Sequence, residues 1–191
     1  MKYKLAILVT FLSLVTGCST YNVASYGTSV QNVETLKSYN LQHMSVGTFQ
    51  VSETLEFKRK PGNQKKPATA SVQCRGAGPV TASPSFEAYI EQAFIEELKL
   101  AGIYDASSSL VLTGKFEQLD FSSAFGNSRW TFTLTLTNAR NESFTTQTTF
   151  GFPSRYLAEV ACAGVAQAFA PAVQQLITDV IKNPKFREIA N

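Results

Sequence analysis

Three cysteines and one histidine are the residues of this chain with the most distinctive chemistry. The sequence has no GxSxG, HExxH, SxxK or Walker motif, so a catalytic role for the histidine, His43, is not expected. One histidine and no CxxC pair also leave too few ligands for zinc. Asp105 and Asp120 could act as paired carboxylates only if the fold joined them, and a loop aspartate is commonly a turn former. The sequence therefore predicts a protein that is not an enzyme and needs no cofactor or metal.

Residues 1–17 have the anatomy of a cleaved signal peptide. Lys2 and Lys4 supply a positively charged start, and a mainly apolar run from Leu5 to Val15 follows. This run is too short to cross a bilayer as a helix. We therefore predict that residues 1–17 are removed. A signal peptide without lipidation and a short buried helix are the alternatives.

The residues that end this segment predict lipidation. Val15-Thr16-Gly17-Cys18 resembles the signal box of bacterial lipoproteins. In that family the cysteine is diacylated on its thiol, becomes the N-terminus by cleavage and is then acylated on its amine. The resemblance implies a lipid anchor at Cys18. The next residue is Ser19 rather than aspartate, as in lipoproteins that are passed on to the outer membrane. The resemblance therefore implies a position on the periplasmic face of that membrane.

The mature chain is long enough for one domain. Cleavage before Cys18 would remove 17 of the 191 residues and leave 174. Loss of Lys2 and Lys4 would lower the net charge from +3 to about +1. Residues 18–42 are polar and lack a sustained apolar period, which predicts a lipidated N-terminus and tether ahead of a single α+β periplasmic domain at 43–191. As an alternative, part of the tether could pack on the domain, because it contains four apolar residues: Val23, Tyr26, Val30 and Val33.

Cys74 and Cys162 form an even pair once Cys18 is acylated. Disulfides form and persist in the periplasm, so we predict a bridge between them. Closing a loop of this length would stabilise the fold by roughly 4 kcal/mol through the lost entropy of the unfolded chain. Two separate buried thiols, each packed as a small apolar side chain, are the alternative.

One acid-free segment concentrates positive charge. It contains five cations: Lys58, Arg59, Lys60, Lys65 and Lys66. Such a cluster could attract acidic lipid headgroups, lipid A phosphates or an acidic polysaccharide. A solvated loop that protects a sheet edge from aggregation is the alternative. Nucleic acid is not an expected partner in this compartment.

Alternating apolar and polar residues predict a sheet. Trp130, Phe132, Leu134 and Leu136 alternate with threonines, and a partner strand returns over 144–150. Earlier extended segments are expected at 45–52, 54–57, 71–74 and 110–121, the first three as a hairpin interrupted by the basic segment and the last with a bulge near 117–118. The threonine-rich face would be solvated or, as an alternative, form a subunit interface.

Two long helices are expected to cover the sheet. The first would begin at Ser83-Pro84 and end at Gly102, and the second would be capped by Ser154 and stop at Asn183-Pro184. Pro171 should kink or split the second helix. The predicted fold is therefore α+β, with a mixed, mainly antiparallel sheet of about five strands and two helices packed on one face.

This order of elements resembles a group of small proteobacterial envelope lipoproteins. The resemblance lies in six stretches: 86–94, 97–102, 112–116, the Trp130 strand, 161–162 and 171–177. Related architecture occurs in ABC-transport auxiliary lipoproteins and in the amino-terminal domain of the Tol-system periplasmic protein. The resemblance implies accessory work in envelope transport, assembly or secretion, and it supplies no catalytic or ligand-binding residue.

Two functions follow as hypotheses. The first is a non-catalytic accessory or assembly component of an envelope transport or secretion complex, in contact with the membrane through its lipid and with a protein partner or a second copy of itself. The alternative is a lipid- or glycan-binding module that uses the basic 58–66 loop. A groove that could take an acyl chain beside that loop would favour binding, whereas a flat apolar or threonine-rich patch would favour assembly.

Overall fold

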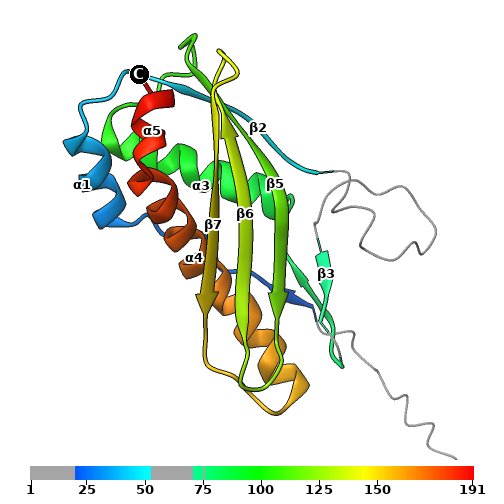
Figure 1. Cartoon of the computed structure of the whole chain (residues 1–191). Coiled ribbons are helices and arrows are strands. Elements are labelled where there is room, and N and C mark those ends of the chain that lie inside the picture. The colour runs from blue at the N-terminus through cyan, green and yellow to red at the C-terminus, as the bar shows by residue number, and fades with distance from the viewer. Residues whose placement is uncertain (1–19, 53–70, 75) are drawn as a thin grey trace, which may run out of the picture.

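The computed structural model describes residues 20–52, 71–74 and 76–191, and in them an α+β domain with two sheets and four helices (Figure 1). The main sheet consists of β2 (Ser45–Val51), β5 (Val111–Ser122), β6 (Arg129–Thr137) and β7 (Ser143–Gly151) in that spatial order. β2 runs parallel to β5, and the other neighbours are antiparallel. The mixed, mainly antiparallel character of the sheet confirms the predicted fold class.

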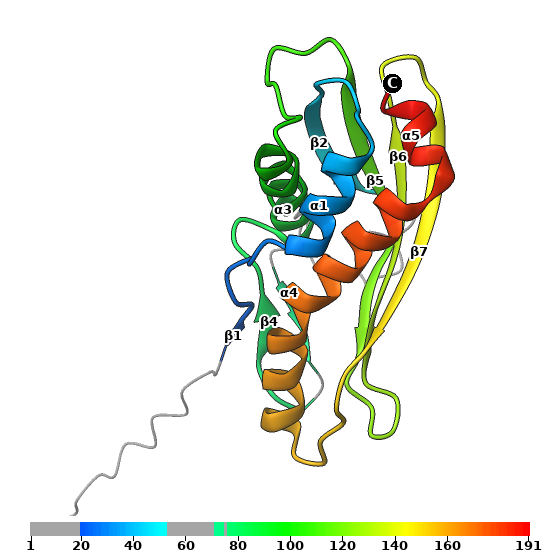
Figure 2. The same cartoon turned by 90° about the vertical axis from the view of Figure 1, so that its left-hand side faces the viewer.

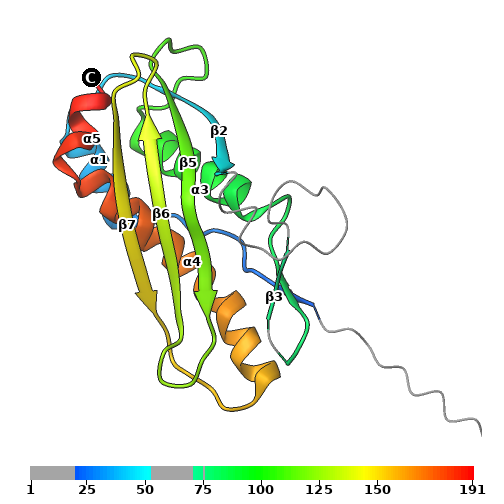
Figure 3. The same cartoon turned by 45° about the vertical axis from the view of Figure 1, so that its right-hand side comes forward.

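The alternating run that predicted β6 fixes its two faces. Trp130, Phe132, Leu134 and Leu136 are buried, and the threonines between them are partly exposed. The pairing of β5 with β6 shifts between Phe116 and Gln118, which is the bulge that the change of parity predicted. The helices cover the apolar face (Figure 2), and the threonine-rich face lies open (Figure 3).

The prediction of a single five-stranded sheet is wrong. A second sheet is formed by β1 (Tyr21–Asn22), β4 (Pro79–Thr81) and β3 (Ser71–Gln73), in the order β1-β4-β3. β3 pairs with β4 and not with β2, so these two strands do not form the predicted hairpin, and the extended stretch predicted at 54–57 lies outside the described residues. Instead β2 pairs in parallel with β5, a contact between residues that lie far apart in the sequence.

The described part of the predicted tether packs against the domain. Residues 20–42 contain β1 and a helix, α1 (Val30–Ser38), whose Val33 and Leu36 are buried. Ser29 caps this helix, because its Oγ accepts a hydrogen bond from the Asn32 N–H at 3.3 Å. Spacing of three residues places Val33 and Leu36 on one face, and that face completes the core. The tether prediction therefore fails from residue 20 onward.

The first long helix, α3 (Phe86–Ala101), begins two residues later than predicted. Ser85 is its cap and accepts a hydrogen bond from the Ala88 N–H at 3.2 Å. Gly102 ends it as predicted, with φ of 77°, in the left-handed region that glycine enters without a steric cost. The helix therefore presents Phe86, Ile90 and Leu98 to the core.

The second long helix, α4 (Ala158–Lys182), is continuous through Pro171, and a short helix, α5 (Pro184–Ile189), follows it. The predicted split does not occur. Pro171 and Gln167 are both exposed, so water can reach the carbonyl that the proline cannot bond. By length and composition α4 could cross a membrane, but 61% of its apolar window is buried inside the protein, as in a core helix.

Trp130 joins the sheet to α4. Its ring is fully buried, and its Nε1–H donates a hydrogen bond of 2.9 Å to the carbonyl of Val165. The ring centre of Phe169 lies 4.8 Å away, and Phe86 and Phe121 also contact the indole. These contacts fix the angle of α4 against β6, and so fix the position of the loop that leads into α4.

Candidate functional site

The structure joins Cys74 and Cys162 in a disulfide with their Cα atoms 6.0 Å apart. Both residues are fully buried. The bond ties the end of β3 to the second turn of α4, across 88 positions of sequence. It therefore holds the small sheet, which includes β1, against the first half of α4. The alternative of two separate buried thiols does not describe this structure.

Cys18 and the five predicted anion-binding residues lie outside the described residues. The five are Lys58, Arg59, Lys60, Lys65 and Lys66.

Four residues with exposed apolar side chains belong to the segments at one end of the domain, where the β5–β6 turn lies beside the passage from β7 into α4 (Figure 1). We call this cluster the apolar tip, and it consists of Phe125, Tyr156, Leu157 and Val160. The rings of Phe125 and Tyr156 stack with centres 3.9 Å apart, although Tyr156 is 83% exposed and Phe125 is 58% exposed. Aromatic rings paired in this way and left open to solvent are typical of a contact surface.

A hydrogen bond between the two loops holds the apolar tip together. The Gly126 N–H donates to Ser154 Oγ at 3.0 Å. Ser154 was predicted to cap α4, and this prediction is wrong because its hydroxyl oxygen serves the neighbouring loop. The helix instead begins after Leu157, which makes no side-chain capping bond. Leu157 is 67% exposed, so the start of α4 presents an apolar side chain to the surroundings.

An open groove of about 410 Å³ continues from the apolar tip along α4. One side of the groove is lined by Phe150, Phe152 and Pro153, and the other side by residues of α4 that include Val160 and Gly164. A Cβ atom added at Gly164 would meet no atom within 4 Å, so the groove is wide at that point. Its volume lies within the range of small-molecule sites, but its position is at the end of the sheet and open to solvent.

The outer face of the main sheet holds a second open hollow, of about 510 Å³. Its lining is polar and includes Thr48, Thr113, Lys115 and Thr137. Gly114 also borders this hollow, but the room left by its missing side chain is on the opposite, buried face of the sheet, where the ring of Phe49 lies against it.

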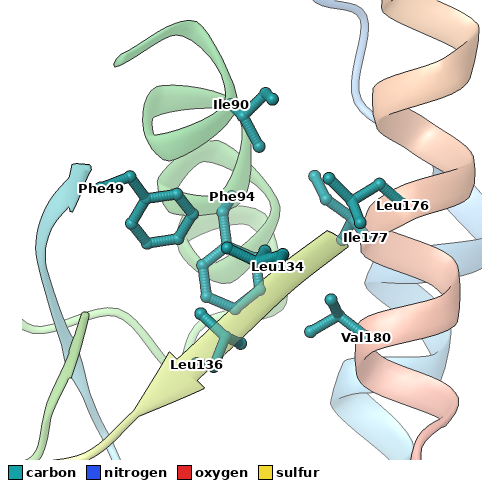
Figure 4. A pocket seen from close by; sticks show the side chains of 8 residues that line it. All are labelled: Phe49, Ile90, Phe94, Leu134, Leu136, Leu176, Ile177 and Val180. Atoms are coloured by element: carbon teal, nitrogen blue, oxygen red, sulfur yellow. The ribbon is translucent and has the colours of Figure 1, made fainter. Parts of the chain in front are cut away.

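One interior cavity lined by described residues is too small for an acyl chain. This cavity of about 10 Å³ lies between β2, α3, β6 and α4 (Figure 4). Its walls are apolar, with Phe49, Leu134 and Val180 among them. A cavity of this size takes about one water molecule at most.

The two candidate aspartates, Asp105 and Asp120, lie far apart in the structure. Asp105 precedes β5, and Asp120 is near the opposite end of that strand, so roughly 30 Å separates them at 3.3 Å per residue. Asp105 accepts hydrogen bonds from the N–H and the hydroxyl of Ser107, and these bonds lower the pKa of its carboxyl. The structure therefore does not pair these two carboxyl groups.

His43 is brought near this aspartate, yet the arrangement is not that of a nucleophilic triad. Ser107 donates its hydroxyl hydrogen to Asp105, and Ser108 donates its own to the carbonyl of His43. In a triad the serine would instead donate to the imidazole. Across residues 20–52, 71–74 and 76–191, no three histidine, cysteine or acidic side chains are grouped to hold a metal ion.

The burial of Glu97 was not predicted from the sequence. Glu97 of α3 is fully buried, and its Oε1 accepts hydrogen bonds from the Tyr26 hydroxyl at 2.5 Å and the Ser29 N–H at 2.9 Å. Burial, and then the bond to Glu97, raises the pKa of the Tyr26 phenol far above its ordinary value. The signal was present, since Glu97 follows Phe94 by three residues and Ile90 by seven on the buried stripe of the helix.

The comparisons with known proteins concern the fold. A crystal structure of a Xanthomonas campestris protein assigned to the family DUF330 superposes with a TM-score of 0.53 at 13% sequence identity. The match covers 85% of this chain and 92% of that one. No protein-family model matches the chain, and no curated protein matches it. The chain therefore shares its fold with this bacterial protein.

Proposed function

We propose that the chain is an outer-membrane-anchored periplasmic lipoprotein and a non-catalytic accessory or assembly component of an envelope transport or secretion complex. The observation that carries this proposal is Val15-Thr16-Gly17-Cys18 after a charged and apolar leader. The disulfide between Cys74 and Cys162 supports it, because such bonds persist in an oxidising compartment. The exposed apolar tip supports a role in contact rather than in catalysis.

The Cys18→Ser variant tests the anchor. We expect it to lose incorporation of a labelled fatty acid, to keep the leader peptide and to leave the outer-membrane fraction. Ser19→Asp is the matched control, because it should keep the acyl chain but change the membrane in which the protein is found. Unchanged acyl labelling and membrane partition in Cys18→Ser would exclude the anchor.

The role in a complex is tested by crosslinking the acylated protein in intact cells and purifying it under denaturing conditions. An envelope transport or secretion protein should be recovered with the wild type and lost with Cys18→Ser. Recovery of the chain alone, at crosslinker concentrations that capture known envelope complexes, would contradict an accessory role.

A second function, binding of an anionic lipid or glycan, is favoured by the acid-free basic segment. Changing its five cations to Gln should weaken binding to anionic vesicles and to lipopolysaccharide. The wild-type binding should also fall with salt, since charges are screened over about 10 Å at 0.1 M. A control with the same charge change replaces five exposed lysines elsewhere: Lys37, Lys99, Lys115, Lys182 and Lys185. Equal loss in both variants would assign the binding to net charge alone.

A further inference from the structure

The exposed apolar side chains of the described residues are unevenly distributed. Six large ones are exposed, and four of them form the apolar tip. The other two, Val30 and Leu100, are single residues at the starting end of α1 and the finishing end of α3. Scattered exposed apolar residues are normal on a protein surface, whereas a cluster that includes stacked aromatic rings marks a contact.

The N-terminal strand leads toward the same end of the molecule. β1 runs parallel to β4, with Tyr21 opposite Val80. The start of β1 therefore lies beside the turn that precedes β4. This turn contacts the beginning of α4, because a Cβ atom at Gly76 would lie 3.2 Å from that of Ala158. Figure 2 shows β1 and β4 beside the first half of α4.

Covalent geometry then limits how far the domain can stand from a lipid at Cys18. Three steps along the chain separate Cys18 from Tyr21, and they span at most about 11 Å. Tyr21 is already paired in the small sheet, which the disulfide ties to α4. An acylated Cys18 therefore holds this end of the domain at the bilayer surface, and the stand-off expected of a 25-residue tether is not available.

We propose that the apolar tip inserts into the interface of the bilayer that carries the lipid anchor, so that anchor and tip together set the orientation of the domain. This inference depends on the proposed acylation of Cys18. Phe125, Tyr156 and Leu157 supply apolar and aromatic groups of the kind that lie at the headgroup level of membranes.

The charges beside the tip indicate what kind of lipid it would contact. Arg155 and Glu159 are both exposed next to it and carry opposite charges. Contact would therefore rest on apolar burial and not on anionic headgroups, so a zwitterionic bilayer should suffice. The same feature separates this contact from any binding by the basic segment, which should require anionic lipid and respond to salt.

Single-cysteine labelling of the full acylated protein tests the proposal. In Leu157→Cys the new thiol would be the one available for labelling, because Cys18 is acylated and Cys74 is bonded to Cys162. Leu100→Cys is the matched control, with a similarly exposed leucine, 56% against 67%. Leu100 lies in the last turn of α3, four residues before Tyr104, which bridges to Met44 just before β2 pairs with the start of β5. The control label is therefore near the end of the main sheet that lies away from the apolar tip.

Each labelled protein is reconstituted in phosphatidylcholine vesicles and exposed to a lipid-bound nitroxide quencher or to aqueous iodide. We expect the nitroxide to quench the label at 157 several-fold more than the label at 100, and iodide to show the reverse order. Adding Phe125→Ser and Tyr156→Ser to Leu157→Cys should remove most of the difference. All three substitutions are at exposed positions, so thermal melting should confirm that the fold is kept.

The outcomes distinguish the proposal from its premise. Protein that carries no acyl chain and is recovered free of vesicles would overturn both the anchor and the inserted tip. Vesicle-bound protein with equal quenching at 157 and 100 would overturn the tip alone. A label at 157 that neither quencher reaches would assign the tip to a protein partner or a second copy, and would also overturn membrane insertion.

Discussion

The hydroxyl of Tyr26 donates a hydrogen bond of 2.5 Å to Oε1 of Glu97, although 71 positions of sequence separate the two residues. Glu97 is fully buried, and the same oxygen accepts the N–H of Ser29 just before α1. A single carboxylate of α3 therefore holds the segment between β1 and α1 through two hydrogen bonds. This contact is one reason why residues 20–42 belong to the domain.

Removal of this carboxylate should destabilise the protein. Glu97→Ala leaves buried donors without an acceptor, so we expect the free energy of unfolding to fall by about 1–3 kcal/mol in urea denaturation. Tyr26→Phe removes one donor and should cost about 1 kcal/mol. Glu96→Gln, on the more exposed side of the same turn, is the matched control and should change little. Equal stability of Glu97→Ala and Glu96→Gln would show that the buried contact is not formed.

Alkaline pH should weaken the same region. Burial, and then the charge of Glu96, raises the pKa of the Tyr89 phenol to about 12, and the pKa of Tyr26 is raised in the same direction. The ordinary pKa of tyrosine is about 10, so between pH 10 and 12 the folded protein holds protons that the unfolded chain has released. The contribution of these two phenols to the free energy of unfolding should therefore be fully present below pH 10 and decline above it. Tyr89→Phe should make that decline shallower in denaturation curves, and an unchanged slope would contradict the assignment.

Reduction of the disulfide should destabilise the domain considerably. Cys74 and Cys162 close a loop of 88 residues, for which the chain-entropy estimate is roughly 4 kcal/mol. Thermal melting of the wild type with and without reductant should show the loss, and a Cys74→Ala/Cys162→Ala variant should melt low in both conditions. Peptide mass mapping of protein taken from the periplasm gives an independent check, in which two free thiols would count against the bond.

Gly114 should not tolerate a side chain. A Cβ atom there would lie 2.7–2.9 Å from three ring carbons of Phe49, whose side chain is only 2% exposed and has little room to move. We expect Gly114→Ala to lower the free energy of unfolding by about 1–3 kcal/mol, the usual cost of overpacking. Gly151→Ala is the control in the same sheet, because its added Cβ meets no atom within 4 Å. Similar denaturation midpoints for the two variants would show that β2 and β5 are less closely packed than described.

The apolar tip could not have been predicted from the sequence. Phe125 belongs to a turn between strands, and Tyr156 and Leu157 belong to the approach to a helix. Each would pass as an isolated apolar residue, since no local pattern connects positions that lie thirty residues apart. The pairing of β5, β6 and β7 brings the two loops to one end, and the bond from Gly126 to Ser154 joins them.

The sequence by itself determined the features that depend on near neighbours. The alternation around Trp130 defined β6, Gly102 ended α3, and two cysteines in a predicted periplasmic chain indicated the disulfide. Tertiary structure decided whether residues 20–42 would pack, which strand β2 would join and whether Pro171 would break α4. Those outcomes depend on burial and on partners that are distant in the chain. The helix that carries Val33 and Leu36 is stable because these side chains are buried against α3 and α4. A proline is tolerated within a helix when the carbonyl that it leaves unbonded faces water.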